Sequence, residues 1–152
     1  MRSNLDWAIA VGQFMSGAES KKQAQLKSIA PQFAVPDVIA AAEYYRDILG
    51  FRILGYFGQP PVFSIVGRDN VEIQLAKMNA NAGPAQNSVQ NEEGLDAYVW
   101  VTDVDSLYAE LKKRGANIIE PPQPRVYHCY EMVVQDRFGF RLAFAMDYPN
   151  PA

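Results

Sequence analysis

The sequence predicts an α+β fold in which two βαβββ units pair around a shared cleft, preceded by a separate N-terminal helix. Three observations support this prediction: a strand–helix–glycine motif at 29–51, a degenerate copy of it at 95–116, and three strand-like segments after each copy. A four-stranded sheet with a single helix leaves its other face bare. We therefore expect the two units to fold as halves of one domain.

The first unit is predicted over 29–77. Alternating apolar residues over 30–35 indicate a strand, and Asp37 is suited to be the N-cap of the helix that follows. Apolar residues then recur at helical spacing, and Gly50 ends the helix. Three strand-like segments come next, RILGYF, VFSIV and VEIQLAK, and they are separated by turns rich in Gly, Pro, Asp and Asn.

The second unit is predicted over 94–148 and repeats this design. Asp103 is the predicted N-cap of its helix and Gly115 its end, followed by NIIE, VYHCYEMVVQ and FRLAFAM. The segment 78–93 between the units is rich in Asn, Gly, Gln and Ser without an apolar period. We interpret it as a flexible linker or a mobile cover over a site, within a single domain at 29–148.

Residues 1–28 lie outside the repeat. Apolar residues at helical spacing over 5–26 predict an amphipathic helix that packs on the domain or on a dimer partner rather than anchoring in a membrane. The sequence contains no run of 18 apolar residues and no signal-peptide pattern. We expect no membrane association.

The charge balance argues against a nucleic-acid partner. The chain has a formal net charge of −3, and residues 29–152 carry ten basic and fifteen acidic side chains, a balance of −5. No run of Lys and Arg forms the basic patch that nucleic-acid binders use. The single cysteine, Cys129, excludes a disulfide within the chain and a CxxC motif. A reducing compartment, the cytoplasm, fits this composition.

The motifs resemble those of a known family. The pattern xVxDVxxAxxYYRDxLGF at 34–51, the KKRGA that closes the second helix and the final QDRFGFRLAF are similar to the vicinal oxygen chelate superfamily. This is the glyoxalase, bleomycin-resistance and extradiol-dioxygenase group, and the pattern is closest to its bleomycin-resistance-like branch. The resemblance implies the paired βαβββ fold, and it leaves open isomerases, dioxygenases, epimerases, drug-inactivating enzymes and drug-binding proteins.

The resemblance also implies four metal-ligand positions, at the start of the first strand and on the last strand of each unit. In this sequence they are Ala30, Gln74, Asp96 and Ala143. Two of the four are alanine, which has no lone pair to donate, and a divalent site of this kind needs three or four nitrogen or oxygen ligands. We therefore predict that the protein has no metal cofactor and favour binding over catalysis.

A metal-dependent lyase, isomerase or dioxygenase remains the alternative. A shift of a strand by two residues keeps the same face and would offer Gln32, Glu72 or Tyr98 as ligands. Glu131 or the sole histidine, His128, could then complete a site with Asp96. A second alternative is a structural or interaction domain whose cleft is filled by its own side chains.

The sheet faces that no helix covers are predicted to form the binding site. Tyr98 and Trp100 share one strand face, and aromatic side chains on such a face suit a flat, apolar or cationic organic molecule through stacking and cation–π contacts. Carboxylates, amides and an arginine of the same parity complete the predicted site. The predicted site residues are Gln32, Phe63, Glu72, Gln74, Asp96, Tyr98, Trp100, Tyr130 and Arg141. The sequence thus predicts a homodimeric protein that sequesters a small molecule without a metal.

Overall fold

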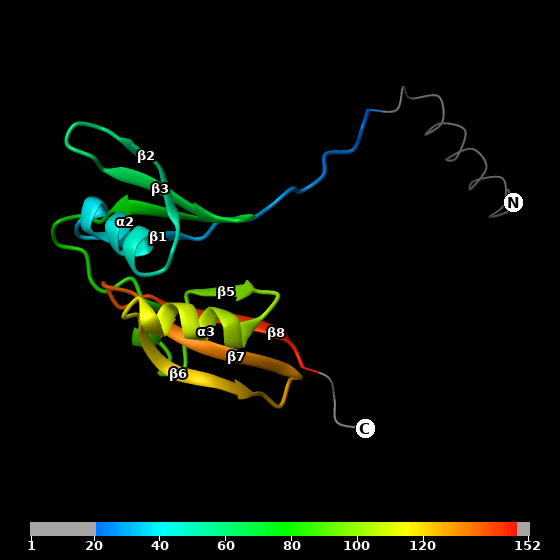
Figure 1. Ribbon diagram of the computed structural model, residues 1–152. Helices are drawn as coiled ribbons and strands as arrows, with labels where there is room; N and C mark the ends of the chain where they lie inside the picture. Colours follow the sequence, from blue (N-terminus) through cyan, green and yellow to red (C-terminus); the bar gives the residue numbers. More distant parts are fainter. Residues whose placement is uncertain (1–20, 149–152) are drawn as a thin grey trace, which may run out of the picture.

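The computed structural model describes residues 21–148, and both halves have the same order of elements (Figure 1). The first unit contains β1 (Gln32–Val35), α2 (Val38–Asp47), β2 (Arg52–Phe57), β3 (Phe63–Arg68) and β4 (Val71–Lys77). The second contains β5 (Ala97–Trp100), α3 (Val104–Lys113), β6 (Asn117–Pro124), β7 (Cys129–Gln135) and β8 (Arg141–Asp147), and a short 3-10 helix, η1 (Asn87–Val89), precedes it.

Each unit forms one four-stranded mixed sheet. The strand orders are β1-β4-β3-β2 and β5-β8-β7-β6. The pairs β1–β4 and β5–β8 are parallel and the remaining pairs are antiparallel. In each unit the helix crosses from the first strand to the opposite edge of the sheet, and the next two turns return the chain to the first strand. The predicted α+β fold of two βαβββ units is confirmed.

The two helices begin as the sequence predicts. The carboxylate of Asp37 accepts the backbone N–H of Ala40 at 2.9 Å, and that of Asp103 accepts the N–H of Ser106 at 3.0 Å. After α2 the chain turns at Gly50, whose φ is +73°. This left-handed backbone conformation favours glycine, and a Cβ at this position would also displace the guanidinium of Arg68, since it would lie 2.7 Å from Nη1.

The predicted N-terminal helix over 5–26 lies mostly outside the described residues. Its last part, 21–26, is described and has no regular structure, so the prediction is wrong there. The reason is the lack of a packing surface: these residues are exposed, including the apolar Leu26, and helices of this length depend on a buried face. Within residues 21–148, no helix combines the length and the apolar character needed to cross a membrane.

The segment between the units is partly fastened to the second unit. The side chain of Gln86 donates to the backbone oxygen of Phe138, and the N–H of Asn87 donates to the carboxylate of Asp96 at 2.8 Å. Arg141 donates to the backbone oxygen of Glu92. The second half of this segment is therefore held against the ends of β5 and β8.

The units meet through a repeated arrangement in which the helix of each unit contacts the last β-turn of the other. The Tyr45 hydroxyl in α2 donates to Oδ2 of Asp136 at 2.9 Å, and Phe33 stacks on Phe140 with ring centroids 4.4 Å apart. On the other side, the guanidinium of Arg68 binds the carboxylate of Glu110 in α3. One continuous cluster of buried apolar residues joins the two units.

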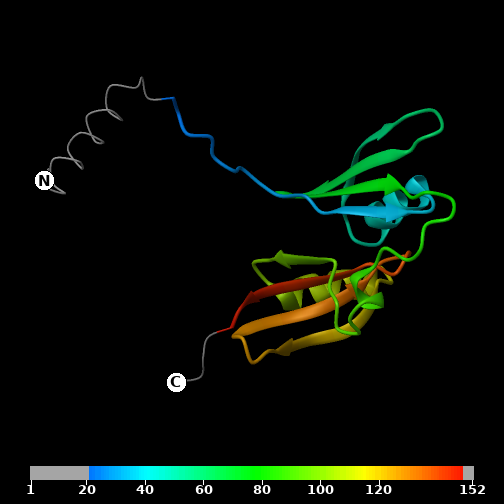
Figure 2. The same ribbon diagram turned by 180° about the vertical axis from the view of Figure 1, so that it is seen from behind.

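The opposite faces of both sheets take no part in this interface. Figure 1 shows α3 lying over one face of the second sheet, and the view from behind in Figure 2 shows β7 and β8 with the helix on their far side. Trp100 and Phe57 remain 59% and 50% exposed on these faces. The described chain alone does not close the predicted cleft over its bare sheet faces.

Candidate functional site

The uncovered face of the second sheet combines aromatic residues with a buried acid. Tyr98 and Trp100 lie on β5, the edge strand, and Glu131 lies two strands away on β7. Between them, the β8 residues opposite Tyr98 and Glu131 are Ala143 and Ala145. Because alanine has no side chain beyond Cβ, the ring of Tyr98 can lie across β8, and its hydroxyl donates to Oε2 of Glu131 at 2.6 Å.

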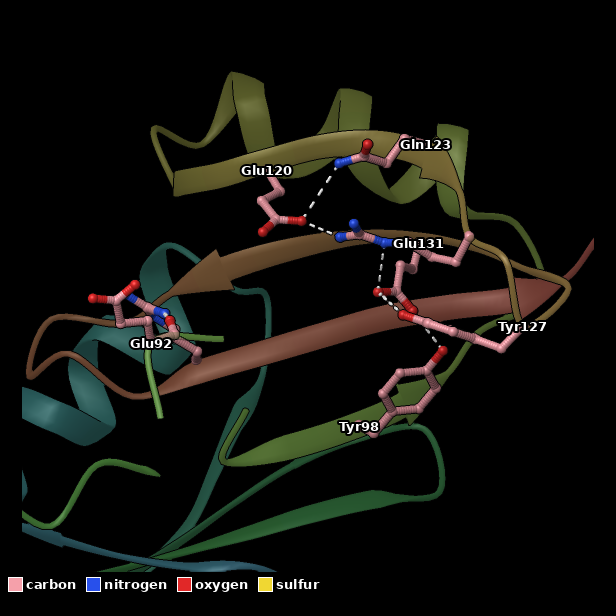
Figure 3. Close-up of polar contacts among 8 residues, drawn as sticks. Glu92, Tyr98, Glu120, Gln123, Tyr127 and Glu131 are labelled. Carbon is pink, nitrogen blue, oxygen red and sulfur yellow. Dashed lines mark hydrogen bonds and ion pairs between the residues drawn. The ribbon is translucent and has the colours of Figure 1, made fainter. Parts of the chain in front are cut away.

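Glu131 is the centre of a hydrogen-bond network (Figure 3). Its side chain is 2% exposed, and besides Tyr98 it accepts the hydroxyl of Tyr127 at 2.6 Å and Nε of Arg125 at 2.9 Å. Arg125 also forms an ion pair with Glu120 at the outer edge of the sheet. The buried carboxylate therefore has three donors, which is the satisfaction that a charge removed from water requires.

The network is acidic and its phenols stay protonated. Two carboxylates, Glu120 and Glu131, share the one guanidinium of Arg125, which leaves a formal charge of −1. Burial and the hydrogen bond to Glu131 raise the pKa of Tyr127 to about 12. Burial, followed by the same kind of hydrogen bond, raises the pKa of Tyr98. Both hydroxyls remain donors near neutral pH, and the face disfavours anionic ligands.

Tyr98 and Trp100 form an aromatic corner on this face. Their ring centroids are 5.4 Å apart at an interplanar angle of 66°, an edge-to-face arrangement. The bond to buried Glu131 fixes the Tyr98 ring, so Trp100 packs against a rigid neighbour. Such a corner can stack on a flat ring or hold a cation above a ring face.

The uncovered face of the first sheet carries four of the predicted site residues, Gln32, Phe63, Glu72 and Gln74. Nε2 of Gln32 donates to Oε1 of Gln74 at 3.1 Å, and Nε2 of Gln74 lies 3.4 Å from Oε1 of Glu72. Phe63 lies beside Phe57, with ring centroids 5.8 Å apart. The structure brings these side chains together as a polar row with an aromatic end.

Three predicted site residues lie elsewhere. Tyr130 is on the helix-covered face, where its hydroxyl donates to Asp105 of α3 at 2.8 Å and its ring stacks on Tyr148. The carboxylate of Asp96 accepts the N–H groups of Asn87 and Arg141, each at 2.8 Å. Asp96 and Arg141 thus fasten the segment between the units.

Sequence reasoning missed the network around Glu131 as a part of the binding face. The signal was the partial alternation along β7, in which Tyr130, Met132 and Val134 form an unbroken row of aromatic and apolar residues, while the other face combines Glu131 and Gln135 with Val133. An apolar row belongs under the helix, so this alternation assigns Glu131, and not Tyr130, to the uncovered face. Arg125 and Tyr127 lie in the turn before β7, and strand parity does not predict the direction of turn side chains.

The comparison with protein families decides the relationship. The profile described as "Glyoxalase/Bleomycin resistance protein/Dioxygenase superfamily" matches residues 25–144. The chain belongs to this superfamily. No curated protein sequence matches the chain significantly.

Several solved structures share the fold. TioX from Micromonospora sp. ML1 is 18% identical, with a TM-score of 0.62 over 80% of this chain and 99% of its own. The bleomycin-binding protein from Streptomyces verticillus, in complex with copper(II)-bleomycin, is 17% identical, with a TM-score of 0.61 over 84% of this chain and 100% of its own. A glyoxalase-related enzyme from Clostridium phytofermentans is 14% identical with a TM-score of 0.64, and covers 84% of this chain and 99% of its own.

The residues at the superfamily's metal positions do not fit a divalent ion. Gln74 lies opposite Gln32, and the two side-chain amides form a hydrogen bond to each other. Ala143 lies opposite Tyr98, whose hydroxyl donates a hydrogen bond to Glu131. Both oxygens of Asp96 accept backbone amides. Among residues 21–148, no three His, Cys, Asp or Glu side chains are grouped as metal ligands would be. The donor set falls short of the three or four ligands that such a site requires.

Proposed function

We propose that this superfamily member binds and sequesters a small aromatic or apolar molecule, neutral or cationic, on its uncovered sheet faces and without a metal cofactor. The observation that carries the proposal is the aromatic corner of Tyr98 and Trp100, fixed by the buried carboxylate of Glu131. A rigid aromatic surface binds a flat ligand at a smaller entropic cost than a mobile one. The negative charge nearby favours a cation.

A second copy of the chain is the proposed cover for these faces. Exposed apolar side chains, among them Leu54, Phe57, Tyr98 and Trp100, lie on them, and a sheet that is bare on one apolar face is stabilised by packing against another layer. In a homodimer, the first sheet of one protomer could face the second sheet of the other. The polar row of Gln32 and Gln74 would then lie opposite the aromatic corner and complete the pocket.

One structural neighbour supports the ligand class. The Streptomyces verticillus protein binds copper(II)-bleomycin on this fold. At 17% identity this likeness establishes the shared fold, so its ligand indicates only the kind of molecule that the fold can hold. We therefore define the proposed ligand by its chemistry.

A charge series of flat three-ring dyes tests the proposal. Proflavine is cationic, acridine is neutral at mildly alkaline pH and acridine-9-carboxylate is anionic, so calorimetric titration with the three separates stacking from charge. We expect proflavine to bind most tightly and the carboxylate most weakly. Tyr148→Ala is the matched control for Trp100→Ala, because Tyr148 is a half-exposed aromatic residue stacked on Tyr130 of the opposite face.

Two outcomes would replace the proposal. One tightly bound divalent ion per chain, found by elemental analysis of protein purified without chelators, would favour the metal-dependent lyase, isomerase or dioxygenase. Failure of all three dyes to bind at millimolar concentration would favour a structural or interaction domain with a filled cleft.

A further inference from the structure

A separate cavity lies between the two units, on the helix-covered side of the sheets. Its volume is about 600 Å³, and it is bounded by the end of α2, the β3–β4 turn, β5 and α3. This inter-unit cavity, whose floor includes Leu49, Val71, Val99, Leu111 and Phe144, opens to solvent. Its volume is in the range of small-molecule pockets.

The internal repeat explains why a cavity exists at this place. Phe33 and Val99 hold equivalent positions, each four residues before the helix-capping aspartate, and Tyr45 and Leu111 each lie eight residues after it. The strand register makes Phe140 and Val71 equivalent. Phe140 lies three residues before Ala143, which pairs with Tyr98 of β5, and Val71 lies three residues before Gln74, which pairs with Gln32 of β1. Every pair has an aromatic residue on one side of the unit interface and an aliphatic residue on the other.

The two sides of the interface therefore pack differently. On the aromatic side the Phe33 and Phe140 rings stack, and Tyr45 fills the remaining space and bonds to Asp136. On the aliphatic side three rings are missing. Phe144 occupies the position equivalent to Leu75 and, being larger, fills part of the space that the three rings would occupy. The unfilled part of that space is the cavity, so the cavity follows from the sequence difference between the two copies.

The lining selects the chemistry of an occupant. The floor is apolar, and the charged lining residues are Arg68, Asp69, Asp103 and Glu110, a formal balance of −2. The guanidinium of Arg68 is already engaged, at 2.7 and 3.0 Å by the carboxylate of Glu110 and at 3.0 Å by the backbone oxygen of Leu49. No cation of the lining is left for an anionic ligand, while the acidic rim attracts a cationic one.

We propose that the inter-unit cavity is a second binding site, for a small apolar molecule that is neutral or cationic. It differs from the proposed site on the uncovered faces because its floor residues point away from those faces, and Trp100 of the aromatic corner borders both sites. Both units line it, and the Arg68–Glu110 pair joins them at its edge. An occupant would therefore replace loosely held water against apolar side chains and bind the two units at once.

Methyl NMR with a named probe tests this site. N-phenyl-1-naphthylamine, a neutral apolar dye, is titrated into protein labelled at Val and Leu methyl groups. We expect saturable shifts at Val71, Val99 and Leu111, and Val99→Phe, which restores the ring of the aromatic side, should weaken binding at least about tenfold. Ile119→Phe introduces the same ring at a position on β6 that is 37% exposed and outside the cavity lining, and it should leave the affinity unchanged.

The remaining outcomes distinguish this site from the one on the uncovered faces. The anionic analogue 8-anilinonaphthalene-1-sulfonate should bind the cavity at least about tenfold more weakly than the neutral dye. Phe57→Ala, on the uncovered face, should leave the three methyl shifts intact. The inference is overturned if the wild-type methyl signals do not shift at probe concentrations up to its solubility limit. It is also overturned if Phe57→Ala abolishes the shifts. The wild-type spectra decide this even if Val99→Phe does not fold.

Discussion

The hydroxyl of Tyr98 reaches Glu131 diagonally across β8, where Ala143 lies opposite Tyr98 and Ala145 lies opposite Glu131, and the two oxygens are 2.6 Å apart. Ala143 holds a position where the superfamily resemblance implies a metal ligand. A longer side chain there would occupy the space that the Tyr98 ring crosses. An alanine at position 143 thus provides no metal ligand and leaves space for the hydrogen bond between Tyr98 and Glu131. The polar side chains of this face then converge on the carboxylate of Glu131.

Removing this hydrogen bond should destabilise the fold. Tyr98→Phe keeps the ring but leaves the buried carboxylate with two donors, and hydrogen bonds to charged groups contribute about 1.5–3 kcal/mol. We expect a loss of that order in the free energy of unfolding measured by urea denaturation. Tyr130→Phe is the control, because its partner Asp105 is exposed and solvent can replace the bond. Equal losses in both variants would contradict the special role of Glu131.

Truncating the aromatic corner should weaken ligand binding without unfolding the protein. Trp100 is 59% exposed, so Trp100→Ala removes little buried area from the folded chain. If proflavine stacks on this ring, its affinity should fall by about 1–3 kcal/mol, measured by calorimetry. An unchanged affinity, with the Tyr148→Ala control also unchanged, would exclude Trp100 from the binding site.

The strand and helix positions could be predicted from the sequence because they depend on local signals. The spacing of Asp37 and Asp103 predicts the equivalence of α2 and α3, which begin at Val38 and Val104. Strand parity placed Gln32, Glu72, Gln74, Tyr98 and Trp100 on the uncovered faces. These inferences need only the periods of helices and strands.

The rest depended on contacts between distant residues. Asp96 has the right parity for the cleft, yet backbone amides at 87 and 141 bind its carboxylate. Arg125 is fixed by Glu120 and Glu131, which parity along one strand does not bring together. The sides through which the units meet depend on the fit of the β-turns against the helices, and apolar periodicity contains no such information.

Stability should depend on pH through Asp136. Burial raises the pKa of this carboxyl above its ordinary value, although hydrogen bonds from Tyr45 and from the N–H groups of Phe140 and Phe138 oppose the shift. The folded state then binds more protons than the unfolded state, so the contribution of Asp136 is fully present below its ordinary pKa, about 4, and is lost as pH rises through the raised value.

Asp136→Asn isolates this contribution. The amide oxygen can still accept the N–H groups, and the group no longer titrates. The free energy of unfolding of the wild type, minus that of the variant, should decline as pH rises above about 4. Asp103→Asn should give the opposite slope, because hydrogen bonds from Ser106 lower the pKa of Asp103. A flat difference for Asp136→Asn would show that its pKa is not raised.

The ion pair between Arg68 and Glu110 should stabilise the folded state modestly, and this stabilisation should depend on its bidentate geometry. Arg68 donates to both oxygens of Glu110, at 2.7 and 3.0 Å, and the two side chains are 29% and 37% exposed. At this exposure we expect a coupling energy of about 0.5–1 kcal/mol in a double-mutant cycle with Arg68→Ala and Glu110→Ala. Arg68→Lys should recover little of it, since an ammonium cannot bind both oxygens in parallel. Full recovery by lysine would indicate a purely Coulombic pair.

The packing difference between the two sides of the unit interface predicts opposite tolerance to a change of size. Phe140→Val removes a ring that stacks on Phe33 at 4.4 Å and is 2% exposed, and such a loss costs about 2–4 kcal/mol. Val71→Phe places the same ring at the equivalent position, where the inter-unit cavity provides space. We expect it to change the free energy of unfolding by less than about 1 kcal/mol, whereas overpacking in a filled core costs about 1–3 kcal/mol. Urea denaturation of both variants measures the contrast. A large loss from Val71→Phe would mean that this side of the interface is closed in solution.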